Sequence, residues 1–193
     1  NHMSFDTNGI MNMPLQPAYS GHLSGHQTIA TGTWTKLALA TELYDKNNDF
    51  DSSTNYRFTC PVDGIYLTQL NASFGLTAGN DCGVAVHKNG SERIRRVDVP
   101  GRNGGHFGVN CMGLFDLDAT DYLEFYAFHT EGSDDTITGS KEHSYVMVHK
   151  KAIDYYCDLE GISNKASDST KNTTITNATI ETAVDRNKRL GVE

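Results

Sequence analysis

Several features that define large classes of proteins are scarce in this sequence. Its 193 residues contain four prolines, one tryptophan and four cysteines, and no two cysteines form a C-x-x-C pair. Structural zinc sites are usually built from such pairs, so we expect none here. No apolar run approaches the roughly 20 residues that a helix needs to cross a bilayer. We therefore expect no membrane insertion.

Catalytic signatures are missing as well. The sequence has no Gly-x-Ser-x-Gly elbow, no His-Glu-x-x-His, no glycine loop for phosphates before a helix and no dinucleotide fingerprint. A glycan hydrolase would need paired carboxylates in a cleft, and no motif indicates such a pair. We therefore predict a protein that is not an enzyme.

The charge balance and composition point to a folded, acidic domain. The formal net charge is −8, which disfavours nucleic acid because an acidic surface repels phosphates. The longest basic cluster, Arg93–Arg96, is too short to change this. Hydrophobic residues make up 37% of the chain, enough for a packed core, and the 18 glycines suit strands joined by tight turns.

Strand patterns dominate from Pro17 to about Ala152. Apolar and β-branched runs alternate with turn-forming stretches, and no segment of helical periodicity intervenes. We expect strands at Trp34–Leu39, Tyr56–Cys60, Ile65–Phe74, Gly83–His87, His106–Leu117, Tyr122–His129 and Ser144–Lys150. Many short strands in succession predict a sandwich or jelly roll.

The chain divides into three parts by composition. Residues 1–16 are a predicted leader, in which Asn1–Met3 look like a cloning remnant and the rest like the end of an upstream β-rich element. Residues 17–153 form the predicted domain. Residues 154–193 are polar and rich in Thr and Asn, which predicts an extension or a linker.

The four cysteines leave two possibilities open. Cys60, Cys82, Cys111 and Cys157 are either reduced thiols or disulfide partners. Three of them lie in apolar, strand-like runs, which favours reduced thiols in the core.

The order of elements from Phe50 to Lys151 resembles the C1q-like domain, which is related to the tumour-necrosis-factor fold. The resemblance rests on Asn48–Asp51, Phe58–Tyr66 with its Pro-x-x-Gly-x-Tyr turn, the hairpin Lys88-Asn89-Gly90, Leu114–Leu117, Asp121–Phe125 and Ser144–Val148. Thr120 stands where the family has glycine. The resemblance implies an all-β, ten-stranded antiparallel jelly-roll sandwich that forms trimers.

Aromatic side chains suggest where a trimer would form. Along Tyr122–His129, alternation puts Leu123 and Phe125 on one face and Tyr126 and Phe128 on the other. A strand that is apolar on both faces is buried on both. We therefore expect Leu123 and Phe125 in the core. The predicted trimer interface consists of Tyr66, Phe74, Tyr126, Phe128 and Tyr145. The alternative is that a loop of the same chain covers this face.

One acidic loop is a candidate calcium site. Asp45, Asn47 and Asp49 match positions 1, 3 and 5 of a calcium loop, but Phe50 and Tyr56 occupy positions 6 and 12, so the EF-hand interpretation fails. The predicted cofactors are therefore none, with a structural calcium ion at Asp45, Asp49 and Asp51 kept as a candidate. The favoured alternative is a solvated loop.

The leader Met13–Tyr19 resembles the entry to C-terminal domains of phage fibre and tail proteins. This resemblance implies a virion module, in a fibre, a tail appendage or a capsid decoration, whose partners are its own copies, other virion proteins and a glycan or protein on the host surface. Loops 45–55, 100–106 and 130–142 are the expected contact regions. The alternative is a secreted or cell-surface C1q-like recognition module.

Overall fold

The computed structural model describes residues 4–5, 7, 11–12, 15–76, 79–99 and 107–151. The expectations for Asn1–Met3, for loop 100–106, for Cys157 and for residues 154–193 fall outside the described residues. Short strands β1 (Ser4–Phe5) and β2 (Met11–Asn12) pair with each other. No helix of the described part is long and apolar enough to span a membrane.

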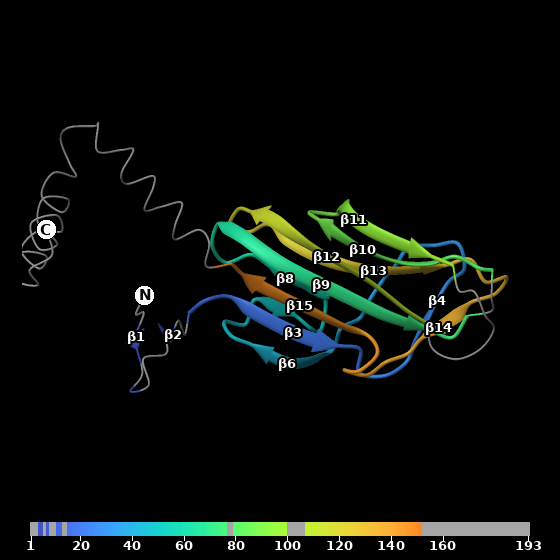
Figure 1. Cartoon of the computed structure of the whole chain (residues 1–193), viewed down its shortest axis with the longest axis horizontal. Coiled ribbons are helices and arrows are strands. Elements are labelled where there is room, and N and C mark those ends of the chain that lie inside the picture. Colours follow the sequence, from blue (N-terminus) through green and yellow to red (C-terminus); the bar gives the residue numbers. More distant parts are fainter. Residues whose placement is uncertain are drawn as a thin grey trace, which may run out of the picture. The chain divides into compact units, whose positions relative to one another are not determined.

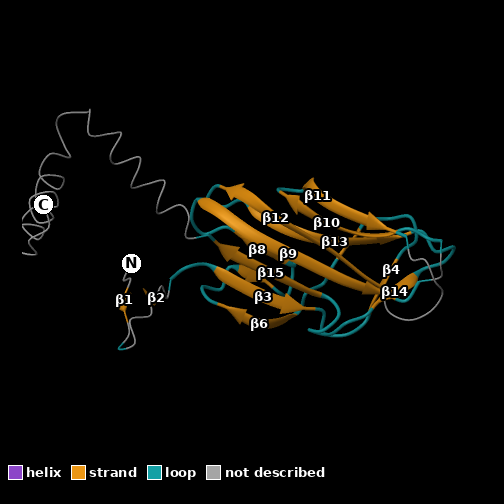
Figure 2. Ribbon diagram, viewed as in Figure 1, coloured by secondary structure: helices purple, strands orange, loops and turns teal. Residues whose placement is uncertain are grey.

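The domain is a sandwich of two antiparallel sheets (Figures 1 and 2). In one sheet β11 (Ser91–Asp98), β10 (Cys82–Lys88), β13 (Tyr122–His129), β8 (Arg57–Thr59) and β7 (Phe50–Asp51) lie side by side, and β5 (Thr35–Lys36) also pairs with β13. In the other, the order is β4 (Gln27–Ile29), β14 (Asp135–Ile137), β9 (Gly64–Phe74), β15 (Tyr145–Lys150), β3 (Ala18–His22) and β6 (Thr41–Asp45), and β12 (Phe107–Leu117) also pairs with β9.

Ten of these strands form two facing layers, β6-β3-β15-β9-β12 and β7-β8-β13-β10-β11. The prediction of an all-β, ten-stranded antiparallel jelly roll is therefore confirmed, with β4, β5 and β14 as short additions. Of the ten, β3, β6, β7 and β11 were not predicted from the sequence, and neither were the short strands β4 and β14. The predicted strand Trp34–Leu39 shrinks to Thr35–Lys36, and Leu37 and Leu39, which follow it, are fully buried.

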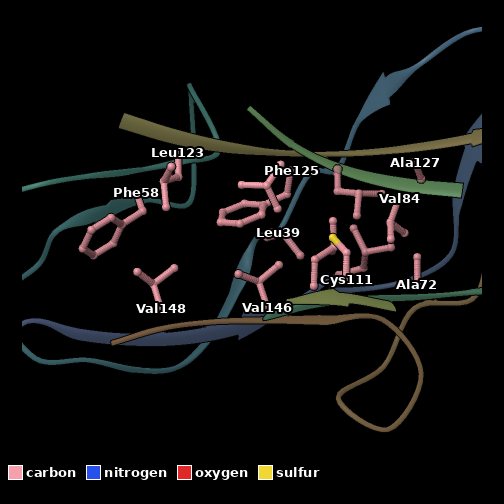
Figure 3. Close-up of a cluster of buried hydrophobic side chains, with 14 of the residues drawn as sticks. Leu39, Phe58, Ala72, Val84, Cys111, Leu123, Phe125, Ala127, Val146 and Val148 are labelled. Carbon is pink, nitrogen blue, oxygen red and sulfur yellow. The ribbon is translucent and has the colours of Figure 1, made fainter. Parts of the chain in front are cut away.

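The core lies between the two layers (Figure 3). Leu123 and Phe125 of β13 are fully buried, as predicted, and they point toward Val146 and Val148 of β15 in the opposite sheet. Each strand thus sends every second side chain inward, and the large aliphatic and aromatic groups fill the interior. This alternation determines which side chains remain for the two outer faces.

Two turns that the sequence predicts have the positive φ angles that glycine favours. Asn89 and Gly90 have φ angles of 52° and 76° in the hairpin between β10 and β11, as expected for an Asn-Gly turn. Gly64, in the Pro-x-x-Gly-x-Tyr turn, has a φ of 149°, a conformation that side chains disfavour. Tyr66 follows two residues later and returns to the buried face.

Thr120 departs from this pattern at a position that requires the left-handed conformation. Its φ is 78°, which is unfavourable for a β-branched residue. Its backbone N–H donates to the Cys60 carbonyl at 2.8 Å, and Asp121 closes the turn by donating to the Asp118 carbonyl at 3.0 Å. These contacts hold the strained backbone in place.

We expect Thr120→Gly to stabilise the fold by roughly 0.5–1 kcal/mol, because glycine adopts this φ without the steric cost that threonine bears. Chemical denaturation measures the change. The neighbouring Ala119→Gly is the matched control and should destabilise by roughly the same amount, because Ala119 has no positive φ. Equal effects of the two substitutions would contradict the strain at Thr120.

Candidate interaction surface

Two of the predicted interface aromatics lie inside the core. Tyr66 and Phe74 are 0% and 1% exposed in the single chain, so neither side chain can contact another subunit. The Tyr66 hydroxyl donates to the Val62 carbonyl at 2.7 Å, and its ring lies beside Phe58, with ring centroids 5.7 Å apart. Burial raises the pKa of Tyr66 far above its usual value. The assignment of these two residues to an interface is therefore wrong.

Two others lie on the outer face of the six-stranded sheet, and the chain itself covers them. Trp34, which precedes β5, stacks on Phe128 with ring centroids 5.1 Å apart. His87 of β10 stacks on Tyr126 at 4.1 Å. This is the alternative in which the same chain covers the aromatic face. Tyr126 and Phe128 remain partly exposed, so their place in a trimer interface stays a prediction.

The fifth residue, Tyr145, lies on the outer face of the seven-stranded sheet. Its neighbours in β15, Val146 and Val148, point into the core, so Tyr145 and Met147 point outward. On β12 of the same sheet Met112 and Leu114 also point outward, and they are the most exposed large hydrophobic side chains of the described part, at 64% and 63%.

Strand register joins these side chains into one surface. Met112 pairs with Gln69 of β9, which pairs on its other side with Met147. Leu114 pairs with Leu67, which pairs in turn with His149. Cross-strand partners share a face of the sheet, so these two rows run across β12, β9 and β15. We call this outer surface the apolar face, and it is formed by Ile65, Leu67, Met112, Leu114, Tyr145 and Met147.

A histidine borders the apolar face on the side of β6. The His149 Nε2 atom lies 2.8 Å from the Tyr44 hydroxyl, and the two rings are 5.9 Å apart. Burial lowers the pKa of His149 and raises the pKa of Tyr44. Both shifts favour the neutral forms, so this pair keeps the border of the face uncharged.

The candidate calcium loop uses its carboxylates for its own backbone. Asp45 accepts hydrogen bonds from the N–H groups of Asp49 at 3.0 Å and Phe50 at 2.8 Å. Asp51 accepts from the Thr54 N–H at 2.9 Å and from the Asn55 side chain at 2.7 Å, and these bonds hold its pKa well below the usual range. These are turn-forming bonds of aspartate.

Asp49, the third candidate ligand, interacts with the Asn47 amide at 3.4 Å, and burial raises its pKa. The structure therefore does not gather Asp45, Asp49 and Asp51 into a metal-binding group. Within the described residues, no group of three or more His, Cys, Asp or Glu side chains could hold a metal ion. An open hollow of about 600 Å³ beside the loop is lined by Glu42, Asp49, Asp51, Cys60 and Thr120, among others.

The described cysteines are buried free thiols. Cys60, Cys82 and Cys111 form no disulfide with one another, and burial is the main cause of the raised pKa of each. Burial raises the pKa of Cys82 to about 12 and that of Cys111 to about 11. A thiol that stays protonated is a poor nucleophile, so these groups serve packing.

Comparisons with known proteins agree with this architecture. No protein-family model matches the chain. It is 27% identical over 136 residues to YqcC of Bacillus subtilis (strain 168), a protein described as uncharacterized. The match covers 67% of this chain but only 33% of YqcC.

Similar solved structures include Eiger TNF from S. frugiperda, with a TM-score of 0.52, 12% identity and coverage of 70% of this chain and 91% of that one. The globular domain of zebrafish complement 1qA has a TM-score of 0.52 and 17% identity over 70% and 97% of the two chains. Murine APRIL at pH 5.0 has a TM-score of 0.53 and 11% identity over 70% and 99%. The fold is a jelly roll of the TNF and C1q type. The C1q-like resemblance of the sequence is thus confirmed for the fold.

We expect the free energy of unfolding to fall as the pH drops below about 6.5, the usual histidine pKa. Burial lowers the pKa of both His149 and His87 in the folded state, so the unfolded chain binds more protons in this range. Denaturation at a fixed protein concentration between pH 7.5 and 5.5 measures the slope. His149→Gln and His87→Gln should each flatten it, and the double variant most. An unchanged slope in the double variant would contradict this origin.

Proposed function

We propose that this chain is a non-enzymatic jelly-roll module that works as a homotrimer in a structural or recognition role. The observation that carries the proposal is the apolar face, where Met112 and Leu114 project from β12 beside half-buried Leu67 and Met147. Soluble monomers rarely expose such a contiguous apolar patch, and a patch of this kind marks an interaction site. The trimer that the C1q-like resemblance implies would bury it.

The contrast between the two outer faces supports this assignment. On the six-stranded sheet, the chain's own Trp34 and His87 stack on the outward aromatics. On the seven-stranded sheet, no described segment of the chain covers Met112 and Leu114, which remain more than half exposed. Antiparallel sheets normally present polar side chains to water on their outer face. The apolar face therefore suits contact with other copies of the chain.

The direction of the chain suggests which end performs recognition. The Lys150 N–H donates to the Pro17 carbonyl at 3.1 Å, so the chain enters and leaves the domain at the same end. Asp45, which opens loop 45–55, pairs with Tyr19 near this end. Strand β14, within loop 130–142, pairs with Phe74 at the far end of β9. Loop 130–142 is thus at the free end, and we propose it as the contact region.

We further propose that the module belongs to a virion, as part of a fibre, a tail appendage or a capsid decoration that touches a host surface. The support is the resemblance of Met13–Tyr19 to the entry of such domains and the polar, Thr- and Asn-rich segment 154–193. The second proposal is a secreted or cell-surface recognition module. The C1q type of the fold supports it equally, because one fold hosts many functions.

The first prediction from this proposal concerns native mass. Light scattering should give a mass near three times the 21.2 kDa of the chain at micromolar concentration. Leu114→Asp should shift the protein to monomers, because a charge would be buried in an apolar contact. Val99→Asp is the matched control, since Val99 is also exposed but lies after β11 on the other sheet. A monomeric wild-type chain would contradict the trimer.

The second prediction tests which end of the domain binds a host surface. Binding of the labelled domain to glycan arrays or intact cells should be lost on reversing Asp134 to Lys at the free end. Lys46→Glu at the opposite end should leave binding intact.

Antibodies against the domain should label virus particles by electron microscopy if the virion proposal holds. Labelling of the cell surface or the medium alone would favour the secreted module.

A further inference from the structure

The open hollow of about 600 Å³ beside loop 45–55 has a lining of one charge sign. Glu42 of β6, Asp49 of the loop and Asp51 of β7 contribute three carboxylates. Of the described residues that line the hollow, none is basic. Lys46 in the loop and Arg57 on β8 are close in sequence, but neither belongs to the lining. We call this feature the acidic hollow.

The three carboxylates of the acidic hollow have no counter-ion among the described residues. The ion pairs of the described part involve other carboxylates, such as that of Glu124 with Lys36. Burial raises the pKa of Asp49, because its negative charge is poorly solvated there. Hydrogen bonds from the loop hold the pKa of Asp51 well below the usual range, so its carboxylate stays ionised. A positive group in the hollow would therefore meet uncompensated negative charge.

A buried hydroxyl beside the acidic hollow also lacks a partner. Tyr19 is 0% exposed, and its hydroxyl makes no hydrogen bond within the described residues. Its ring stacks on Phe50, which lines the hollow, with the ring centroids 4.0 Å apart. Burial, together with the nearby Glu42 and Asp45 carboxylates, raises the pKa of Tyr19 far above its usual value. Buried polar groups normally have partners, so this wall of the hollow is an incomplete polar site.

The size and lining of the acidic hollow suit a long basic side chain rather than a bare metal ion. No group of His, Cys, Asp and Glu side chains among the described residues could hold a metal. Phe50, Cys60 and Pro61 give the hollow an apolar wall. Lysine and arginine bury an apolar stem against such a wall while the charged head meets carboxylates. Leu43, which follows Glu42 on β6 and is 51% exposed, offers an apolar contact to a neighbouring residue of the same ligand.

We propose that the acidic hollow binds a lysine or arginine side chain on a segment of a partner protein. The hollow lies at the end where the chain enters the domain, because the Asn47 side chain donates to the Leu15 carbonyl at 3.4 Å. A segment bound there leaves loop 130–142, at the opposite end, free for recognition. This inference goes beyond the proposed trimer and holds whether or not the chain trimerises.

Peptide binding to the full chain tests the proposal. An array of short peptides carries lysine, arginine, glutamine or glutamate at the centre and randomised flanking residues. The strongest binder is labelled, and its Kd is measured by fluorescence anisotropy at low salt. One variant carries Glu42→Gln and Asp49→Asn. Its matched control carries Asp134→Asn and Glu142→Gln, which remove the same two charges from loop 130–142. A third variant, Ser52→Lys, brings an ammonium group of the chain itself into the lining.

We expect the array to select lysine or arginine over glutamine and glutamate. The variant of Glu42 and Asp49 should raise the Kd about tenfold or more, because charged hydrogen bonds are lost, whereas the control should leave it unchanged. Ser52→Lys should abolish binding, and unfolding midpoints verify that each variant is folded. An array without preference for a basic centre, or equal Kd values of variant and control, would overturn the proposal. Displacement of the peptide by an equal concentration of spermidine would identify a free polyamine as the ligand and overturn the protein partner.

Discussion

The alternation of side chains along a strand is the constraint on which the other features depend. In a two-layer sandwich, each strand gives one set of side chains to the core and the other set to an outer face. Strand β13 gives Leu123 and Phe125 to the core and Tyr126 and Phe128 to the outside. Strand β12 gives Phe115 and Leu117 to the core and Met112 and Leu114 to the outside. The role of the outward side chains on each strand depends on whether the chain itself covers them.

The outer set of β13 is covered by polar and aromatic contacts within the chain. Lys36 of β5 lies 2.5 Å from the Glu124 carboxylate, which is largely buried, and Tyr126 donates to the same carboxylate at 3.3 Å. A buried charge needs such partners, because an unpaired carboxylate there would be costly. Burial and the nearby Glu124 raise the pKa of Tyr126 to about 12. This face is therefore completed internally, whereas the face of β12 is not.

Periodicity predicted six of the ten sandwich strands and the core face of β13, but Tyr66 and Phe74 of β9 were assigned to the wrong face. Along Ile65–Phe74 the face of Leu67 continues with Gln69 and Asn71, whereas the face of Tyr66 continues with Leu70, Ala72 and Phe74, so the full alternation indicates that Tyr66 points inward. The structure buries Tyr66 and leaves Leu67 outward, because β13 packs opposite the first set. Strand β11 was missed because three arginines hide its alternation. The partners of Tyr126 and Phe128 lie 39 and 94 residues away in the sequence, at His87 and Trp34, beyond the reach of any local pattern.

The arginines of β11 have a simple explanation, since charged residues on edge strands prevent unwanted pairing with other sheets. That role requires charge but is indifferent to its sign. Strand β11 accordingly mixes its three arginines with Glu92 and Asp98, which pair with Arg95 and Arg96. Protection of an edge strand therefore accounts for the charges of β11 without a partner.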